Sequence, residues 1–129
     1  MQAEVTRAGQ LPPRAFVIED DVHTLSLLIE LVASTGLEPV PFTRLSSARR
    51  ALRDRVPSVM VVDDDLPDGR GSELVREVRA NPRTRQVKVL FCSAASLSRR
   101  REMAHLAQVI PKPFKLHEME RALAEVAAG

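Results

Sequence analysis

Residues 59–69 read VMVVDDDLPDG, an apolar run that turns abruptly acidic. A second run of the same kind, AFVIEDD, occupies residues 15–21. Short apolar runs without alternation are typical of strands that are buried on both faces of a parallel sheet. Packing gives such a strand no reason to end in three acids. The two runs therefore predict a functional site at the place where these strands finish.

Strand-like and helix-like segments alternate along the chain, which predicts five β/α units, a parallel sheet and helices on both of its faces. We expect Ser46 or Ser47 to cap the second helix and Ser72 to cap the third. The fourth helix is expected over roughly residues 98–107. The expected strands are residues 15–19, 38–42, 59–62, 87–92 and 109–110.

The second expected strand contains Pro39 and Pro41. Proline has no backbone N–H to donate to a neighbouring strand, so it is largely confined to the edges of sheets. We therefore place this strand outermost, which gives a five-stranded parallel sheet of the flavodoxin-like order 2-1-3-4-5. In this order the first and third strands are neighbours, and both acidic clusters meet at the edge where ligands bind in open α/β sheets.

Crowded carboxylates at this edge predict a metal site. The six carboxylates of residues 19–21 and 63–65 would repel one another and raise each other's pKa values unless a cation neutralised them. Oxygen ligands favour Mg²⁺ or Ca²⁺. Ser93 directly follows the fourth strand and Lys112 follows the fifth, so a hydroxyl and an ammonium reach the same edge. Together these groups are the parts that phosphoryl transfer needs.

The pattern resembles the receiver domain of bacterial two-component response regulators over about residues 14–127. The resemblance implies that Asp63 accepts a phosphoryl group from a histidine kinase or a phosphotransfer protein. It also implies that Glu19, Asp20, Asp63 and the backbone carbonyl of Asp65 hold Mg²⁺. The protein would then be a switch with at most slow autodephosphorylation, rather than an enzyme.

By the same resemblance, Ser93 stands where the family has Thr or Ser, and Lys112 stands at the family's lysine, with a cis bond to Pro113. Two features depart from the family. Val109 occupies a position that often holds Tyr or Phe, and the segment from Ser93 to Val109 is short. Phosphorylation chemistry should survive both changes, whereas signalling through an aromatic switch is in doubt.

Two other functions remain open beside the phosphoacceptor switch. The first is a degenerate receiver that acts only as a binding module. The presence of the full set of site residues argues against it. A phosphohydrolase of the haloacid dehalogenase type would also use an Asp-x-Asp pattern such as Asp63 and Asp65. That class needs a catalytic acid after the lysine and a cap segment, and the sequence offers neither.

Composition limits the partners and the compartment. The 129 residues have a formal net charge of +2, no Trp or Tyr and four Phe, which disfavours stacking on nucleic acid bases. No apolar run approaches the roughly 20 residues of a membrane span, and the N-terminus does not resemble a signal peptide. We expect a cytoplasmic protein with a disordered extension at residues 1–13 and a receiver domain at 14–129. Its expected partners are the phosphodonor and a downstream protein target, not nucleic acid or membrane.

Several polar residues are expected to be merely structural. Asp64 and Asp68 are interpreted as parts of a solvated turn, and residues 99–101, all arginine, as a solvated helix face or else a docking patch for an acidic partner. Cys92 is expected to be buried as a small apolar residue. The three histidines lack ligand-like spacing and are expected to be surface or helix residues; they are His23, His105 and His117.

Overall fold

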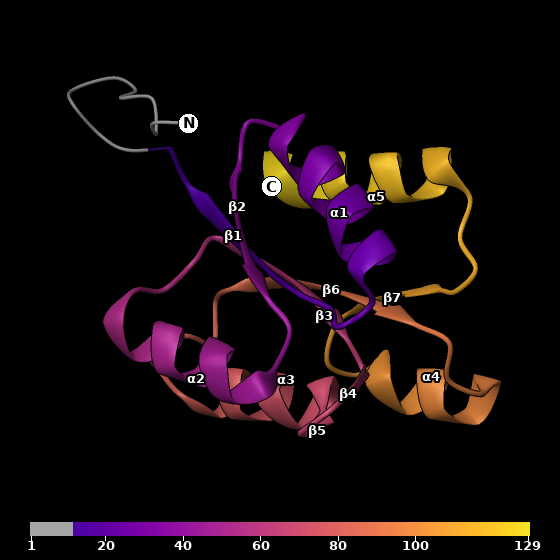
Figure 1. Ribbon diagram of the computed structural model, residues 1–129. Coiled ribbons are helices and arrows are strands. Elements are labelled where there is room, and N and C mark those ends of the chain that lie inside the picture. The colour runs from indigo at the N-terminus through magenta and orange to yellow at the C-terminus, as the bar shows by residue number, and fades with distance from the viewer. Residues whose placement is uncertain (1–11) are drawn as a thin grey trace.

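Five parallel strands form the central sheet of the computed structural model, which describes residues 12–129 (Figure 1). The strand order is β2-β1-β3-β6-β7, which confirms the predicted order 2-1-3-4-5 of the five-stranded sheet. All strand bounds fall within one residue of those expected from the sequence. The strands are β1 (Arg14–Ile18), β2 (Glu38–Phe42), β3 (Val59–Asp63), β6 (Lys88–Ser93) and β7 (Gln108–Pro111).

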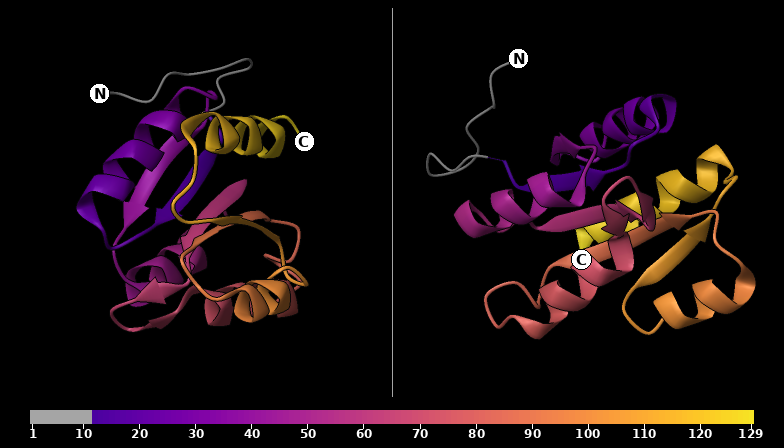
Figure 2. Two further views of the ribbon diagram at one scale, coloured as in Figure 1. Left: turned by 90° about the vertical axis from the view of Figure 1, so that its right-hand side faces the viewer. Right: turned by 60° about the horizontal axis from the view of Figure 1, so that its bottom comes forward.

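Helices cover both faces of this sheet, as predicted (Figure 1, Figure 2). One face carries α1 (Val22–Ala33) and α5 (Leu116–Ala128), and the other carries α2 (Leu45–Asp54), α3 (Gly71–Ala80) and α4 (Leu97–Met103). Side chains of β1 and β3 alternate between the two apolar layers, since successive side chains of a strand point to opposite faces. The sheet is therefore buried on both sides, and its polar groups emerge at the strand ends.

The fourth helix is shorter than the expected span of residues 98–107, because α4 ends at Met103. Met103 is buried, and the chain then turns so that Leu106 packs against the core. Arg79 of α3 fixes this turn by donating from Nε to the backbone oxygen of Leu106 at 3.2 Å.

Both serine caps expected from the sequence are wrong. The helix α2 begins at Leu45, and the carboxylate of Asp68 accepts from the backbone N–H groups of Leu45 and Ser46 at 2.9 and 3.0 Å. These two hydrogen bonds hold the pKa of Asp68 below its usual range, and Asp68 is thus more than a solvated turn residue. The third helix begins at Gly71, and Ser72 lies within its first turn. A cap supplied from 23 residues away cannot be read from local sequence.

A two-stranded antiparallel hairpin, β4 (Asp65–Leu66) and β5 (Gly69–Arg70), follows β3 directly. This hairpin was not among the elements expected from the sequence. Gly69 has φ of +144°, a conformation that residues with a Cβ rarely adopt. The hairpin returns the chain to the end of β3, so residues that follow the sheet are folded back over it.

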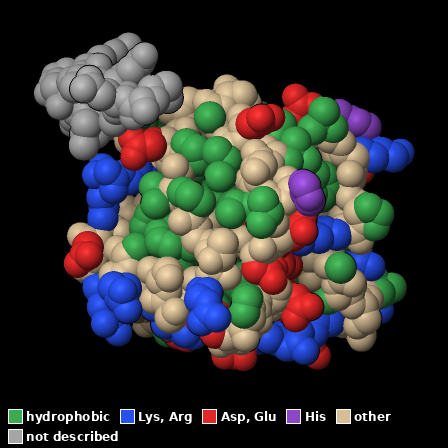
Figure 3. Space-filling view, in the orientation of Figure 1, with side chains coloured by type: hydrophobic (Ala, Val, Ile, Leu, Met, Phe, Trp, Pro, Cys, Tyr) green, Lys and Arg blue, Asp and Glu red, His purple; other side chains and the backbone are tan. Residues whose placement is uncertain are grey.

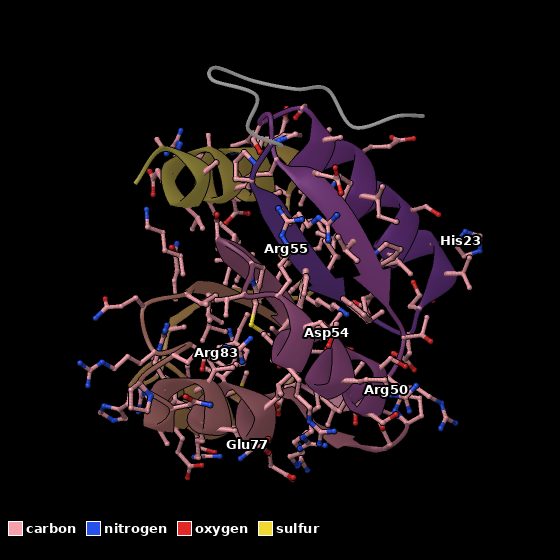
Figure 4. All side chains as sticks on the ribbon, turned by 90° about the vertical axis from the view of Figure 1, so that its left-hand side faces the viewer. His23, Arg50, Asp54, Arg55, Glu77 and Arg83 are labelled. Atoms are coloured by element: carbon pink, nitrogen blue, oxygen red, sulfur yellow. The ribbon has the colours of Figure 1, made fainter. Side chains whose placement is uncertain are left out.

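Surface and buried positions agree with the remaining expectations. Cys92 is buried, and burial raises the pKa of its thiol to about 12. The three histidines are exposed, and Figure 4 shows His23 pointing outward from α1. Across residues 12–129, the helices fall short of the length and apolar character that a membrane span requires. Residues 1–11 of the expected disordered extension lie outside the described part of the chain, so the domain boundary stays a prediction.

Gly71 gives the tightest backbone contact near the site. Its N–H donates to the Asp64 carbonyl at 3.0 Å. A Cβ added at Gly71 would lie 2.1 Å from the backbone oxygen of Asp63 and 2.6 Å from Cγ1 of Val62. Backbone cannot move aside as a flexible side chain can, so α3 and the end of β3 fit together only with glycine here.

We predict that Gly71→Ala lowers the free energy of unfolding by about 1–3 kcal/mol, because the added methyl group overpacks a rigid contact. Urea denaturation of both proteins measures the difference. Arg76→Ala, an exposed change in the same helix, is the control and should alter stability little. A Gly71→Ala variant as stable as the parent would contradict the packing described above.

Candidate functional site

The acidic clusters meet at the carboxyl edge of the sheet, as predicted. Parallel pairing of Ile18 with Val62 places the following residues, Glu19 and Asp63, side by side. One carboxylate oxygen from each of Glu19, Asp20 and Asp63 lies within 4.8 Å of the others. Glu19 and Asp63 are buried, whereas Asp20 is exposed. In Figure 3 acidic side chains gather below α1, on the side of the molecule where β1 and β3 end.

Burial and repulsion together raise the pKa of Asp63 to near neutral pH. Burial raises the pKa of its carboxyl group to about 7, and the charge of Glu19 contributes to the same effect. The ammonium of Lys112 opposes both without cancelling them. A nearby divalent cation would relieve this repulsion, since positive charge favours the ionised carboxylate.

Lys112 is the basic group of the cluster. Its Nζ donates to Oε1 of Glu19 at 2.5 Å and lies 3.6 Å from Oδ1 of Asp63. Burial acts to lower the pKa of Lys112, but the hydrogen bond to Glu19 and the charge of Asp63 outweigh it and raise the value. The backbone N–H of Lys112 donates to the Ser93 carbonyl at 2.8 Å, and the bond between Lys112 and Pro113 is cis, as expected.

Ser93 is buried at the end of β6, and its Oγ accepts from the backbone N–H of Ala95 at 3.0 Å. The strand ends enclose a pocket of about 350 Å³. All six residues singled out from the sequence line it: Glu19, Asp20, Asp63, Asp65, Ser93 and Lys112. The six residues that the sequence singled out therefore lie around one cavity, and their roles stay predictions.

The donor set fits a divalent cation that prefers oxygen. Glu19, Asp20 and Asp63 carry three carboxylates against the single charge of Lys112. An excess of negative charge held this closely is relieved by Mg²⁺, which binds one or two carboxylates together with substrate phosphate oxygens. The exposed residue Asp65 follows Asp63 by two positions at the pocket wall, and its carbonyl remains the expected fourth protein ligand.

Asp64 contradicts the expectation of a solvated turn, because its side chain is only 2% exposed. Its Oδ1 accepts from the backbone N–H of Ser72 at 2.9 Å, and Nε and Nη2 of Arg99 each lie 3.2 Å from its Oδ2. Burial acts to raise the pKa of Asp64, but the Ser72 hydrogen bonds and the Arg99 charge outweigh it and lower the value.

Arg99 contradicts the expectation of a solvated arginine face, since it joins the first turn of α4 to the end of β3. Its Nη2 also donates to Oγ of Ser72 at 2.8 Å, so one guanidinium links three elements. Sequence spacing offered no signal for this pair. The partners lie 35 residues apart, and Arg99 is indistinguishable in sequence from the two arginines that follow it.

We predict that Arg99→Met lowers the free energy of unfolding by about 1–3 kcal/mol, because it leaves the buried Asp64 with fewer hydrogen-bond partners. Urea denaturation measures the change. Arg101→Met alters an exposed arginine of the same helix and serves as the control. Equal stability of the two variants would show that the Asp64 contacts do not hold α4.

We predict that Asp63→Asn stabilises the metal-free protein at pH 8. The folded pKa of about 7 lies above the ordinary value of 3.8, so the folded state keeps a proton that the unfolded chain has lost. The stability of the parent therefore falls as pH rises from about 4 to about 7. Thermal unfolding in EDTA should show a gain on the order of 1–3 kcal/mol at pH 8 and a smaller gain at pH 5. The same gain at both pH values would exclude ionisation of Asp63 as its cause.

Comparisons with known proteins agree with this geometry. Residues 15–124 match the family model of the response regulator receiver domain. The chain is 29% identical over 110 residues to the phosphate regulon transcriptional regulatory protein PhoB of Rhizobium meliloti (strain 1021), a match that covers 83% of the chain and 48% of PhoB. The chain thus spans about half the length of this curated relative.

Solved structures of other proteins have the same fold. A sensor protein from Polaromonas sp. JS666 superposes with a TM-score of 0.77 at 26% identity, covering 90% of this chain and 96% of that one. The receiver domain of sensor histidine kinase PA1611 from Pseudomonas aeruginosa PAO1, which has a magnesium ion coordinated in its active site cleft, gives 0.78 at 22% identity. That match covers 92% of this chain and 99% of PA1611's receiver domain. The family match spans most of the chain, and the chain therefore belongs to the response regulator receiver domain family.

Proposed function

We propose that this protein is a phosphoacceptor switch, in which Asp63 receives a phosphoryl group in a reaction that depends on Mg²⁺. One observation carries the proposal. The carboxylates of Glu19, Asp20 and Asp63 cluster within 4.8 Å, with the Lys112 ammonium 3.6 Å from Asp63. Receiver domains are typically phosphoacceptor switches rather than enzymes, and we propose at most slow autodephosphorylation here.

The transfer step follows from the positions of the side chains. A carboxylate oxygen of Asp63 attacks phosphorus in line, while the bond from phosphorus to a histidine nitrogen of the donor breaks and its electron pair stays on the imidazole. Lys112 neutralises one phosphoryl oxygen, and the Ser93 hydroxyl donates to another. Mg²⁺ held by Glu19, Asp20, Asp63 and the Asp65 carbonyl supplies further charge neutralisation when it is bound.

We propose that the switch acts through α4. Oγ of Ser93 accepts a hydrogen bond from the backbone N–H of Ala95, two residues along the chain. The helix α4 begins only two residues after Ala95, at Leu97. When the Ser93 hydroxyl turns toward a phosphoryl oxygen, it leaves this hydrogen bond, and the loop before α4 must adjust. Val109 is half-buried against the core and offers no ring to rotate, which favours α4 as the moving element.

The proposed donor is a histidine kinase or a histidine phosphotransfer protein, and the proposed target is a protein that reads the α4 surface. We propose that the receiver itself acts in the cytoplasm, without nucleic acid or membrane as a direct partner. Its curated relative PhoB is a transcriptional regulatory protein of about twice the matched length, so this exclusion concerns the receiver only. A degenerate receiver that only binds a partner is the alternative.

We predict that the chain gains one phosphoryl group when it is incubated with Mg²⁺ and acetyl phosphate, because Asp63 then has both an ionised carboxylate and a reactive donor. Intact-protein mass spectrometry measures the adduct. Asp63→Asn should gain none, and removal of Mg²⁺ with EDTA should abolish the adduct in the parent.

Asp54→Asn is the control and should be phosphorylated like the parent, since it changes an exposed acid of α2 that lies outside the pocket. A phosphorylated Asp63→Asn variant would show that the acceptor is another residue. An unmodified parent that also fails to bind Mg²⁺ in calorimetry would sink the switch and leave the degenerate receiver.

A further inference from the structure

Arg70 is a second basic group at the pocket wall, and the transfer step described above does not use it. It lines the same pocket as Asp63 and Lys112. Its side chain is 53% exposed, so the guanidinium is accessible to solvent. No other described arginine lines this pocket.

The β4–β5 hairpin determines the position of Arg70 at the pocket wall. Arg70 pairs directly with Asp65 across the antiparallel ladder, and Leu66 pairs with Gly69. Side chains of residues directly opposite in such a ladder lie on the same face. Asp65 and Arg70 therefore both face the pocket, and Arg70 is held opposite a residue only two positions after the phosphoacceptor.

Arg70 is anchored by one weak contact that it can leave at little cost. Its Nη1 donates to Oδ2 of Asp64 at 3.3 Å, and within residues 12–129 this is the one side-chain hydrogen bond of Arg70. The same Oδ2 lies 3.2 Å from both Nε and Nη2 of Arg99, and Ser72 serves Oδ1. Asp64 would therefore stay paired if Arg70 moved away.

The charge balance at the site gives Arg70 a reason to move. Lys112 already donates to Glu19, so its single charge is shared with a buried carboxylate. A phosphoryl group brings about −1.5 to −2 further charges at pH 7. A guanidinium binds two phosphoryl oxygens at once in a planar fork, which an ammonium cannot do.

We propose that Arg70 leaves Asp64 to bind the phosphoryl oxygens of the incoming donor and of the aspartyl phosphate that forms. It is thus an anion-binding residue of the transfer reaction, a role that rests on the proposed function of Asp63. The ligand class is a phosphoryl group on an acyl or imidazole leaving group. With acetyl phosphate, the bond from Asp63 to phosphorus forms, the acyl phosphate bond breaks, and acetate leaves with the electron pair.

The test compares Arg70→Gln and Arg70→Lys with Arg76→Gln, an exposed arginine on α3 outside the pocket. Rates of Asp63 phosphorylation are measured over a range of acetyl phosphate concentrations at saturating Mg²⁺. We expect Arg70→Gln to lower the second-order rate constant roughly tenfold, since the variant loses a charge-assisted hydrogen bond to the phosphoryl oxygens. Arg70→Lys should recover part of the rate, and Arg76→Gln should match the parent.

Two further measurements separate direct binding from a structural role. Calorimetry should give Arg70→Gln a weaker affinity for fluoroberyllate, a phosphoryl mimic that bonds to the acceptor carboxylate, and an unchanged or tighter affinity for Mg²⁺. Urea denaturation should leave its stability near that of the parent, whereas loss of Arg99 destabilises the fold. Lower stability together with weaker Mg²⁺ binding in Arg70→Gln would overturn the proposal in favour of a structural role.

The outcomes also separate this inference from the function on which it rests. A parent that takes no phosphoryl group refutes the proposed function, and the role of Arg70 falls with it. A parent that is phosphorylated at the same rate as Arg70→Gln, with the same fluoroberyllate affinity, refutes the role of Arg70 and leaves Asp63 as the acceptor.

Discussion

Repulsion between carboxylates at the ends of β1 and β3 is the constraint on which the site depends. The parallel register places Glu19 beside Asp63, and because both are buried, little water screens their charges. Lys112 directly follows β7, and its ammonium offsets part of the negative charge of these carboxylates. The remainder favours a divalent cation, so the fold itself creates the demand for the metal.

A second layer of charge lies directly behind the first. Asp64 lies outside the close cluster of Glu19, Asp20 and Asp63 and anchors two arginines, one from α4 and one from the hairpin. The pKa values of these two neighbouring acids thus shift in opposite directions. The pKa of Asp63 is raised to about 7, and that of Asp64 is lowered. The difference arises from their partners, because both side chains are buried.

Local sequence predicted the five strands of the central sheet and the residues of the pocket, but it did not predict the β4–β5 hairpin or the contacts between distant residues. Strand bounds and order followed from apolar runs and from the two prolines of β2, and all six site residues line one pocket. The Asp64 and Arg99 pair, the Asp68 cap and the short α4 were missed. Each depends on contacts between residues that are far apart in sequence, and periodicity and spacing contain no information about such contacts.

The surface that covers α2 and α3 is rich in arginine, and Figure 4 shows Arg50, Arg55 and Arg83 on that side of the molecule. Arg49 pairs with Glu77 across the two helices at 2.8 Å, and Arg83 donates to the Arg53 carbonyl at 2.9 Å. Part of this basic charge therefore links helices. Exposed pairs of this kind contribute little stability each, and the apolar layer beneath them holds the helices in place.

The Asp68 cap makes the acceptor loop and α2 a single mechanical unit. One short turn closes the hairpin beside the pocket and at the same time starts a helix on the outside of the sheet. An insertion or deletion in this turn would therefore disturb two places at once. In protein engineering terms, the loop is not a module that can be exchanged between receivers, and any graft of it must carry the first turn of α2 along.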